Sequence, residues 1–203
     1  MSLTGPAAVI VLAAGEGTRM KSSTPKVLNE VCGRTMLGHA VAAARELRPA
    51  QLIAVISEAS GPVASYLAEY APDVLPVVQA RRGGTGHAVR TVLDTLGVIH
   101  GTVVVTYGDT PLLRGRTLAG LIAAHESAGA AVTALVARAA DPAGYGRIVR
   151  GPGGAFEAVV EHADATDEQR ANLLRLAERY CVIYQTLKTP PRLASTIESV
   201  GGG

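Results

Sequence analysis

The residues best suited to chemistry lie in a glycine-rich turn near the N-terminus, Leu12-Ala13-Ala14-Gly15-Glu16-Gly17-Thr18-Arg19-Met20, with Lys26 shortly after it. Small residues let backbone N–H groups approach phosphate oxygens closely. Met20 stands where a dinucleotide fingerprint has its third glycine, and no Gly-Lys-Ser/Thr sequence closes a Walker A loop. A turn that is glycine-rich only for tight packing needs no cations. We therefore predict a phosphate site in which Arg19 and Lys26 neutralise charge.

A carboxylate, Asp109, follows the apolar run 102–106 in the stretch Tyr107-Gly108-Asp109-Thr110-Pro111-Leu112. Open α/β sheets bind ligands at the carboxyl ends of their parallel strands. A carboxylate at such an end, next to a flexible glycine, suits Mg²⁺ that is shared with substrate phosphates. The structural alternative is that Asp109 caps a helix or closes a turn before Pro111.

Gln79 and the turn Gly84-Thr85 form a third candidate, again where a predicted strand leads into a helix. An amide beside such a turn can hydrogen-bond the edge of a pyrimidine ring. Structurally, Thr85 could instead be an N-cap. His87 is predicted to be a structural residue of the first helical turn rather than a catalyst.

A fourth candidate combines Glu161 with the glycine-rich stretch Gly144–Ile148. A carboxylate facing a glycine-lined floor could bind sugar hydroxyls, or it could be an exposed charge on a hairpin. The remaining histidines show no metal-ligand spacing and are predicted to be solvated: His39, His100, His125 and His162.

These candidates need a scaffold, and the alternation of apolar runs with helix-period stretches predicts a doubly wound, mostly parallel α/β sheet. The predicted strands are 7–12, 51–56, 73–78, 102–106 and 130–137, and the helices are 36–47, 62–70, 85–96 and 117–128. Two short runs, 147–150 and 156–160, predict an antiparallel hairpin added to the sheet. Further along, 166–179 has helical character and 180–184 is strand-like.

Composition limits the class of partner. The chain has 203 residues, 48% of them hydrophobic, and a formal charge of +2, which is too balanced to drive binding to nucleic acid or to an anionic membrane. No apolar run approaches the ~20 residues of a spanning helix, and no signal peptide is recognisable, so we expect a cytoplasmic protein. Cys32 and Cys181 suggest neither a disulfide framework nor a zinc site. A small-molecule partner is expected, and homo-oligomer formation is left open.

Together these stretches resemble the uridylyltransferase domain of the bacterial bifunctional N-acetylglucosamine-1-phosphate uridylyltransferase/glucosamine-1-phosphate acetyltransferases. The resemblance covers roughly residues 7 to 170. The shared motifs follow one another in the family's order: Leu12–Met20, Pro25–Leu28, Gly84–Ala88, Gly108–Leu112, Gly144–Ile148 and Asp164–Thr166.

The resemblance implies a Rossmann-like sugar nucleotidyltransferase fold and uridylyl transfer from UTP to N-acetylglucosamine 1-phosphate with Mg²⁺. Pyrophosphate and UDP-N-acetylglucosamine, a cell wall precursor, would be the products. It implies that Arg19 and Lys26 face the phosphates and that Asp109 binds the metal. The implied substrate-binding residues are, for the nucleotide, Leu12, Ala13, Ala14, Gly15, Gln79, Gly84 and Thr85, and, on the sugar side, Tyr107, Gly108, Gly146 and Glu161.

The chain departs from this family after Asp164-Ala165-Thr166. The family continues with an asparagine that contacts the sugar and a second that helps bind the metal, whereas this chain's only asparagines are Asn29 and Asn172. The acetyltransferase half is also missing. We therefore divide the chain into an incomplete nucleotidyltransferase domain, 1–170, and an atypical tail, 171–203, that could impair transfer. Two alternatives remain: a nucleotide-binding module without catalysis, which the tail favours, and a related nucleotidyltransferase with another base or acceptor.

Overall fold

The structure is a computed structural model, which describes residues 5–15, 24–81, 83–136, 147–151, 156–160 and 181–185. It divides into two compact units. The first comprises Met1–Ile122 with Tyr184–Thr186, and the second comprises Ala123–Ile183 with Leu187–Gly203.

The first unit is built on parallel strands in the order β5 (Leu75–Val78), β4 (Gln51–Ile56), β1 (Ala8–Leu12) and β6 (Thr102–Tyr107). β1 is apolar throughout because strands covered on both faces have no solvent-facing side. Four of its residues are completely buried: Ala8, Val9, Ile10 and Val11. The predicted parallel sheet is confirmed.

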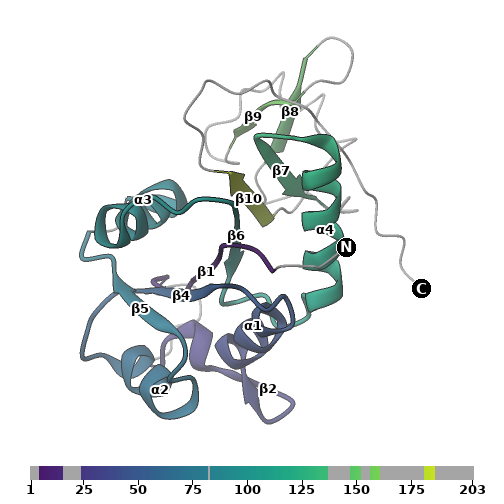
Figure 1. Cartoon of the computed structure of the whole chain (residues 1–203). Coiled ribbons are helices and arrows are strands. Elements are labelled where there is room, and N and C mark those ends of the chain that lie inside the picture. Colours follow the sequence, from purple (N-terminus) through teal and green to yellow (C-terminus); the bar gives the residue numbers. More distant parts are fainter. Residues whose placement is uncertain are drawn as a thin grey trace. The chain divides into compact units, whose positions relative to one another are not determined.

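Helices cover both faces of this sheet, as Figure 1 shows: α3 (Gly84–Leu96) lies on one side, and α1 (Met36–Arg45) and α2 (Pro62–Tyr70) on the other. Ala88, Val89 and Val92 of α3 pack into the cluster that holds Ala8 and Ile10 of β1. Side chains alternate along a strand, so the intervening residues of β1 face away from α3. The doubly wound architecture is confirmed.

β5 begins at Leu75, two residues later than the predicted 73–78. Before it, Asp73 pairs with Arg45 of α1, and the N–H of Val74 donates to the carbonyl of Ala71 in a turn. Edge strands are short and tolerate proline, since their outer N–H groups need no partner in the sheet. Pro76 lies in β5 accordingly.

The segment between β1 and α1 contains elements that the sequence patterns did not predict. A 3₁₀ turn, η2 (Lys26–Leu28), precedes a hairpin of β2 (Glu30–Val31) and β3 (Arg34–Thr35). Its two central residues both have positive φ, 52° at Cys32 and 75° at Gly33, as a tight hairpin loop requires. Two-residue strands are too short to produce a hydrophobic period, so the sequence patterns could not predict this hairpin.

In the second unit, β8 (Arg147–Arg150) pairs with β9 (Phe156–Val160), which confirms the predicted antiparallel hairpin. Within the described residues the two strands form a sheet of their own, whereas the prediction added them to the larger sheet. β7 (Val132–Leu135) lies within the predicted 130–137. Two elements are divided between the units, α4 (Gly115–Ala128) and β10 (Cys181–Gln185). The predicted helical stretch 166–179 lies outside the described residues. Among described helices, none is long and apolar enough to span a membrane.

The prediction that the histidines are solvated is wrong for His125, which is only 1% exposed. Its Nδ1 lies 2.9 Å from Thr133 Oγ1, while its Nε2 has no hydrogen-bond partner in the described part of the chain. Helical periodicity puts His125 on the inner face of α4. His39 also departs from the prediction, since its Nε2 lies 2.8 Å from the carbonyl oxygen of Val31, whereas His100 is exposed.

Burial lowers the pKa of His125 below its usual 6.5, and the charge of Glu126 opposes this effect weakly. The unfolded chain therefore binds a proton more readily than the folded one as pH falls through 6.5. We expect the free energy of unfolding to be lower at pH 5.5 than at pH 7.5. In His125→Asn, whose amide keeps a hydrogen-bonding atom near the Nδ1 position but does not titrate, this pH effect should shrink. Urea unfolding at both pH values measures it, and an equal pH effect in the two proteins would contradict the assignment.

Candidate active site

Three of the predicted site segments meet at the carboxyl edge of the sheet. Leu12, the last residue of β1, is in register with Val55 and with Tyr107, so the strands end level. Backbone bonds extend the ladder past the strand ends: Ala13 N–H donates to Val55 O at 2.8 Å, and Gly108 N–H donates to Leu12 O at 2.9 Å. One strand further, the N–H of Gln79 donates to the carbonyl of Ile56 at 2.8 Å.

The glycines at this edge differ in what requires them. A Cβ on Gly15 would meet no atom within 4 Å, so the described packing does not demand glycine there. A Cβ on Gly108 would lie 3.2 Å from the carbonyl oxygen of Leu12 and 3.3 Å from Leu37 Cδ1, so an alanine there would require its neighbours to shift slightly. Ala13 is buried, Ala14 half-buried and Gly15 exposed, so Gly15 is the most accessible of these three described residues.

A cation and a carboxylate meet at the same edge: Lys26 Nζ lies 2.7 Å from Asp109 Oδ2, although 83 residues separate them in the chain. Both side chains are about one-third exposed, at 35% and 27%. Water screens a pair so placed, and it adds at most about 1 kcal/mol to stability. The pair matters because it places two opposite charges at the carboxyl edge of the sheet.

The 3₁₀ turn η2 holds Lys26 in place. Val27 anchors it in the core at 3% exposure. The side chain of Asn29 donates from Nδ2 to the carbonyls of Lys26, at 3.0 Å, and Pro25, at 3.4 Å. The carbonyl of Asn29 accepts from the N–H of Met36 at the start of α1. Lys26 is therefore positioned by both the core and α1.

Asp109 does not cap a helix. α4 begins only at Gly115, and the turn after β6 is closed by the hydroxyl of Thr110, which donates to the carbonyl of Tyr107 at 2.8 Å. The capping alternative is therefore wrong. Asp109 does lie in the turn that follows β6, as the turn alternative predicts, and its carboxylate pairs with Lys26.

The donor set tests whether a magnesium ion would fit here. The described residues contain no group of three or more His, Cys, Asp or Glu side chains able to hold a metal. Mg²⁺ is commonly bound by one or two carboxylates together with substrate phosphates and waters. The partly exposed carboxylate of Asp109 fits such an ion arriving with a nucleotide, and a cage made only of described side chains is not available.

Gln79 is almost buried, at 5% exposure. Its Nε2 lies 2.8 Å from His87 Nδ1 and donates to the carbonyl of Gly84 at 3.3 Å. The prediction that Thr85 could be an N-cap is wrong, because the cap of α3 is Gly83, which has no side chain. Thr85 is the second residue of the helix and is half-buried.

Three predicted site residues lie outside the described residues: Arg19, Gly146 and Glu161. Conversely, two residues that hold others in place were not singled out for that role, Asn29 and His87. Asn29 follows Lys26 by three residues, a spacing that permits a side-chain bond to the turn. His87 follows Gly84 by three residues, one helical turn later.

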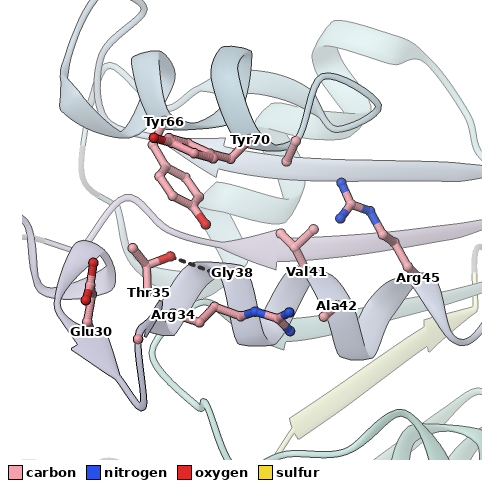
Figure 2. Close-up of a pocket in the computed structure, with 11 residues that line it drawn as sticks. Glu30, Arg34, Thr35, Gly38, Val41, Ala42, Arg45, Tyr66 and Tyr70 are labelled. Carbon is pink, nitrogen blue, oxygen red and sulfur yellow. Dashed lines mark hydrogen bonds between the residues drawn. The ribbon is translucent and has the colours of Figure 1, made fainter.

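A separate pocket of about 480 Å³ lies between α1, α2 and the β2–β3 hairpin, as Figure 2 shows. The stacked rings of Tyr66 and Tyr70, whose centroids are 5.1 Å apart, form one wall. The other polar lining groups include Thr35, whose hydroxyl caps α1, and Arg45, which holds the pKa of Asp73 below its usual value. The pocket contains none of the predicted site residues.

The carboxyl edge thus brings together an accessible glycine turn, a cation beside a carboxylate, and a buried amide. Small residues and a cation suit phosphates, and the carboxylate suits a metal shared with them. The fold and site define a Rossmann-like α/β domain of the nucleotide-binding class.

Comparison with known proteins narrows this class. A family model described as the MobA-like NTP transferase domain matches residues 9–180, and the chain belongs to this family. The chain is 56% identical over 175 residues to the bifunctional protein GlmU of Thermobifida fusca, and 58% identical over 173 residues to that of Streptomyces avermitilis. Each match covers 84% of this chain and 36% of the relative, so the chain spans about a third of these relatives' length.

Solved structures support the fold. A putative glucose-1-phosphate thymidylyltransferase from Bacillus anthracis superposes with a TM-score of 0.69 at 19% identity, covering 88% of this chain and 71% of the other. A CMP:2-keto-3-deoxy-manno-octonic acid synthetase complexed with CTP gives 0.63 at 18% identity, covering 88% and 73%. The predicted sugar nucleotidyltransferase fold is confirmed.

Gly84 opens α3 at a φ of +83°, a conformation that costs a residue with a Cβ about 1 to 2 kcal/mol. Gly84→Ala should therefore lower the free energy of unfolding by about 1 kcal/mol. Gly86→Ala is the matched control, since a Cβ there also meets nothing within 4 Å but needs no positive φ, and alanine favours helix. Chemical denaturation of both variants measures the difference; equal stability would refute a backbone requirement at Gly84.

Proposed function

We propose that this chain catalyses uridylyl transfer from UTP to N-acetylglucosamine 1-phosphate, giving UDP-N-acetylglucosamine and pyrophosphate. The observation that carries the proposal is the Lys26–Asp109 pair beside the Ala13–Gly15 turn. The substrates in the proposal are those that the resemblance of the motifs implies. The sequence identity to the GlmU proteins supports the proposal. The proposal places the reaction in the cytoplasm, with small molecules as partners and neither nucleic acid nor membrane.

The chemistry is an in-line displacement, in which an oxygen of the sugar phosphate attacks the α-phosphorus of UTP and pyrophosphate leaves. Such a reaction depends on positioning and charge neutralisation rather than on a covalent intermediate. The N–H groups of Ala14 and Gly15 would donate to the phosphates, since that of Ala13 is already paired with the carbonyl of Val55, and Lys26 and Arg19 would oppose the phosphates' charge. Mg²⁺ held by Asp109 and the phosphates would stabilise charge on the transferring group.

On the acceptor side, the proposal assigns the sugar to Tyr107, Gly108, Gly146 and Glu161. Gly108 is buried and tightly packed, and it has no side chain, so its backbone would form part of the floor of the sugar site. On the nucleotide side, Leu12 ends β1 directly before the turn, and Gln79 with Gly84 and Thr85 lies beside the start of α3.

A second candidate is nucleotide binding without turnover. It is favoured by the sequence after Asp164-Ala165-Thr166, which departs from the resemblance and whose only asparagine is Asn172. Binding of UTP uses groups in the described first unit, whereas transfer also needs the acceptor held within ~3 to 3.5 Å of the phosphorus. UTP affinity by calorimetry and pyrophosphate release with N-acetylglucosamine 1-phosphate, measured on one preparation, separate the two candidates. A panel of UTP, CTP, dTTP and ATP separates both from a relative that uses another base.

Asp109→Asn keeps the size of the side chain and removes its charge. If Asp109 binds the metal, pyrophosphate release should fall at least ~10²-fold, the scale seen when an electrostatic group at the transition state is removed. Asp94→Asn, which removes an exposed carboxylate paired with Arg90 on α3, is the control and should leave the rate unchanged. Undiminished turnover in Asp109→Asn would exclude the metal-binding role.

Lys26→Ala tests the phosphate-binding role. It should weaken binding of UTP far more than binding of uridine, because only the triphosphate carries the charge that Lys26 opposes. Arg90→Ala removes a cation from an exposed ion pair elsewhere and should affect neither ligand. Calorimetry with both ligands measures the effect, and equal losses for UTP and uridine would show that Lys26 is structural.

A further inference from the structure

The amide of Gln79 has its orientation set by two partners of different kinds. The carbonyl of Gly84 can only accept a hydrogen bond, so the group facing it at 3.3 Å is the NH₂ of Gln79 and not its oxygen. The same NH₂ lies 2.8 Å from His87 Nδ1, which must then be the unprotonated, accepting nitrogen. His87 consequently carries its proton on Nε2 when neutral.

These bonds use both N–H groups of the amide and leave Gln79 Oε1. No hydrogen bond to that oxygen occurs within the part of the chain that the structure describes. Because Gln79 is only 5% exposed, its protein partners rather than water decide which way the amide points. Gln79 follows β5 at the carboxyl edge, so it would offer a nucleotide base an acceptor and not a donor.

An acceptor at this point discriminates between pyrimidines. The ring nitrogen N3 of uracil carries a hydrogen and donates, whereas N3 of cytosine has none and only accepts. An acceptor facing N3 pairs with uracil and leaves two lone pairs opposed with cytosine, and unpaired polar groups in a site give strong discrimination.

We infer that His87 is a positioning residue that fixes the amide of Gln79 in its accepting orientation and so favours uridine over cytidine nucleotides. The inference rests on the proposed function. Without the accepting Nδ1, one of the two bonds that hold the amide is lost and the flipped amide, which offers cytosine a donor, becomes accessible. The glycine at position 83 leaves room for His87, since an added Cβ there would lie 2.7 Å from the Cβ of His87.

Two substitutions isolate this role. His87→Asn places a carbonyl oxygen at the branch position that Nδ1 occupies and can still accept from Gln79. His87→Leu fills a similar volume with no acceptor. We expect the ratio of UTP to CTP affinities, measured by calorimetry, to fall about 10-fold or more in His87→Leu and to stay within about 3-fold of the original in His87→Asn.

A second measurement requires no variant. Long-range ¹H–¹⁵N spectra of the labelled chain at pH 8 report which ring nitrogen of His87 is protonated, and we expect Nε2. Protonation on Nδ1 would overturn the inference, because Nδ1 could then not accept from Gln79. This readout stands even where His87→Leu does not fold.

The outcomes separate the inference from the proposed function. An unaltered chain that binds UTP and CTP equally contradicts uridine as the preferred base. Preference for UTP that survives in His87→Leu leaves the proposed function intact and rejects the role of His87. Loss of preference in His87→Leu, retained in His87→Asn, supports both.

Discussion

The level ends of buried parallel strands set the position of everything else in the first unit. β1 has neighbours on both edges and helices over both faces of the sheet, so a change of register would break two ladders of hydrogen bonds and disturb the close packing on both faces. Its pairing with β4 and β6 fixes Leu12 beside Val55 and Tyr107. The chain must leave each strand at the same edge, and the residues that leave the strands there become neighbours regardless of their separation in sequence.

Lys26 and Asp109 form a charged pair because this constraint brings the segments that hold them to the same edge of the sheet. Asp109 is placed directly by the end of β6, whereas Lys26 depends on an anchored turn stapled by Asn29. The resulting pair is too exposed to contribute much stability. It does hold a cation against the carboxylate, so a metal ion would compete with Lys26 for Asp109 unless phosphates paired with the ammonium. A metal ion bound to a triphosphate would bring its own charge to Asp109 and phosphate oxygens to Lys26.

The sequence predicted the elements whose patterns are long and continuous. β1, β4, β6 and α3 extend over five or more residues each, and hydrophobic runs or helical periodicity identified them with the correct type. The β2–β3 hairpin was not predicted because it depends on two residues with positive φ and not on a hydrophobic pattern. His125 was misjudged because a polar residue type was taken to indicate exposure, although its position on α4 puts it inside.

The candidate site likewise contains some residues that the sequence could predict and others that it could not. Asp109 and Gln79 were identifiable because they directly follow apolar strands, and strand ends converge in any parallel sheet. Asn29 supports Lys26, and His87 supports Gln79, through side-chain hydrogen bonds whose formation depends on local geometry. Neither spacing nor residue type distinguishes such a bond from a solvated side chain. Thr85 shows the opposite error, since a residue type that favours capping lies inside the helix.

Asn29 and His87 affect two different parts of nucleotide recognition, the attraction of the phosphates and the choice of base. Asn29 helps position a charge, whose attraction for phosphate is long-ranged and weakened by salt. His87 helps orient a neutral amide in a nearly buried position, where hydrogen-bond geometry decides the outcome and salt has little effect. Affinity for the triphosphate and preference for the base are therefore physically separable at this edge. Lys26 would attract any nucleoside triphosphate, and the selection among bases would depend on the uncharged contacts around Gln79.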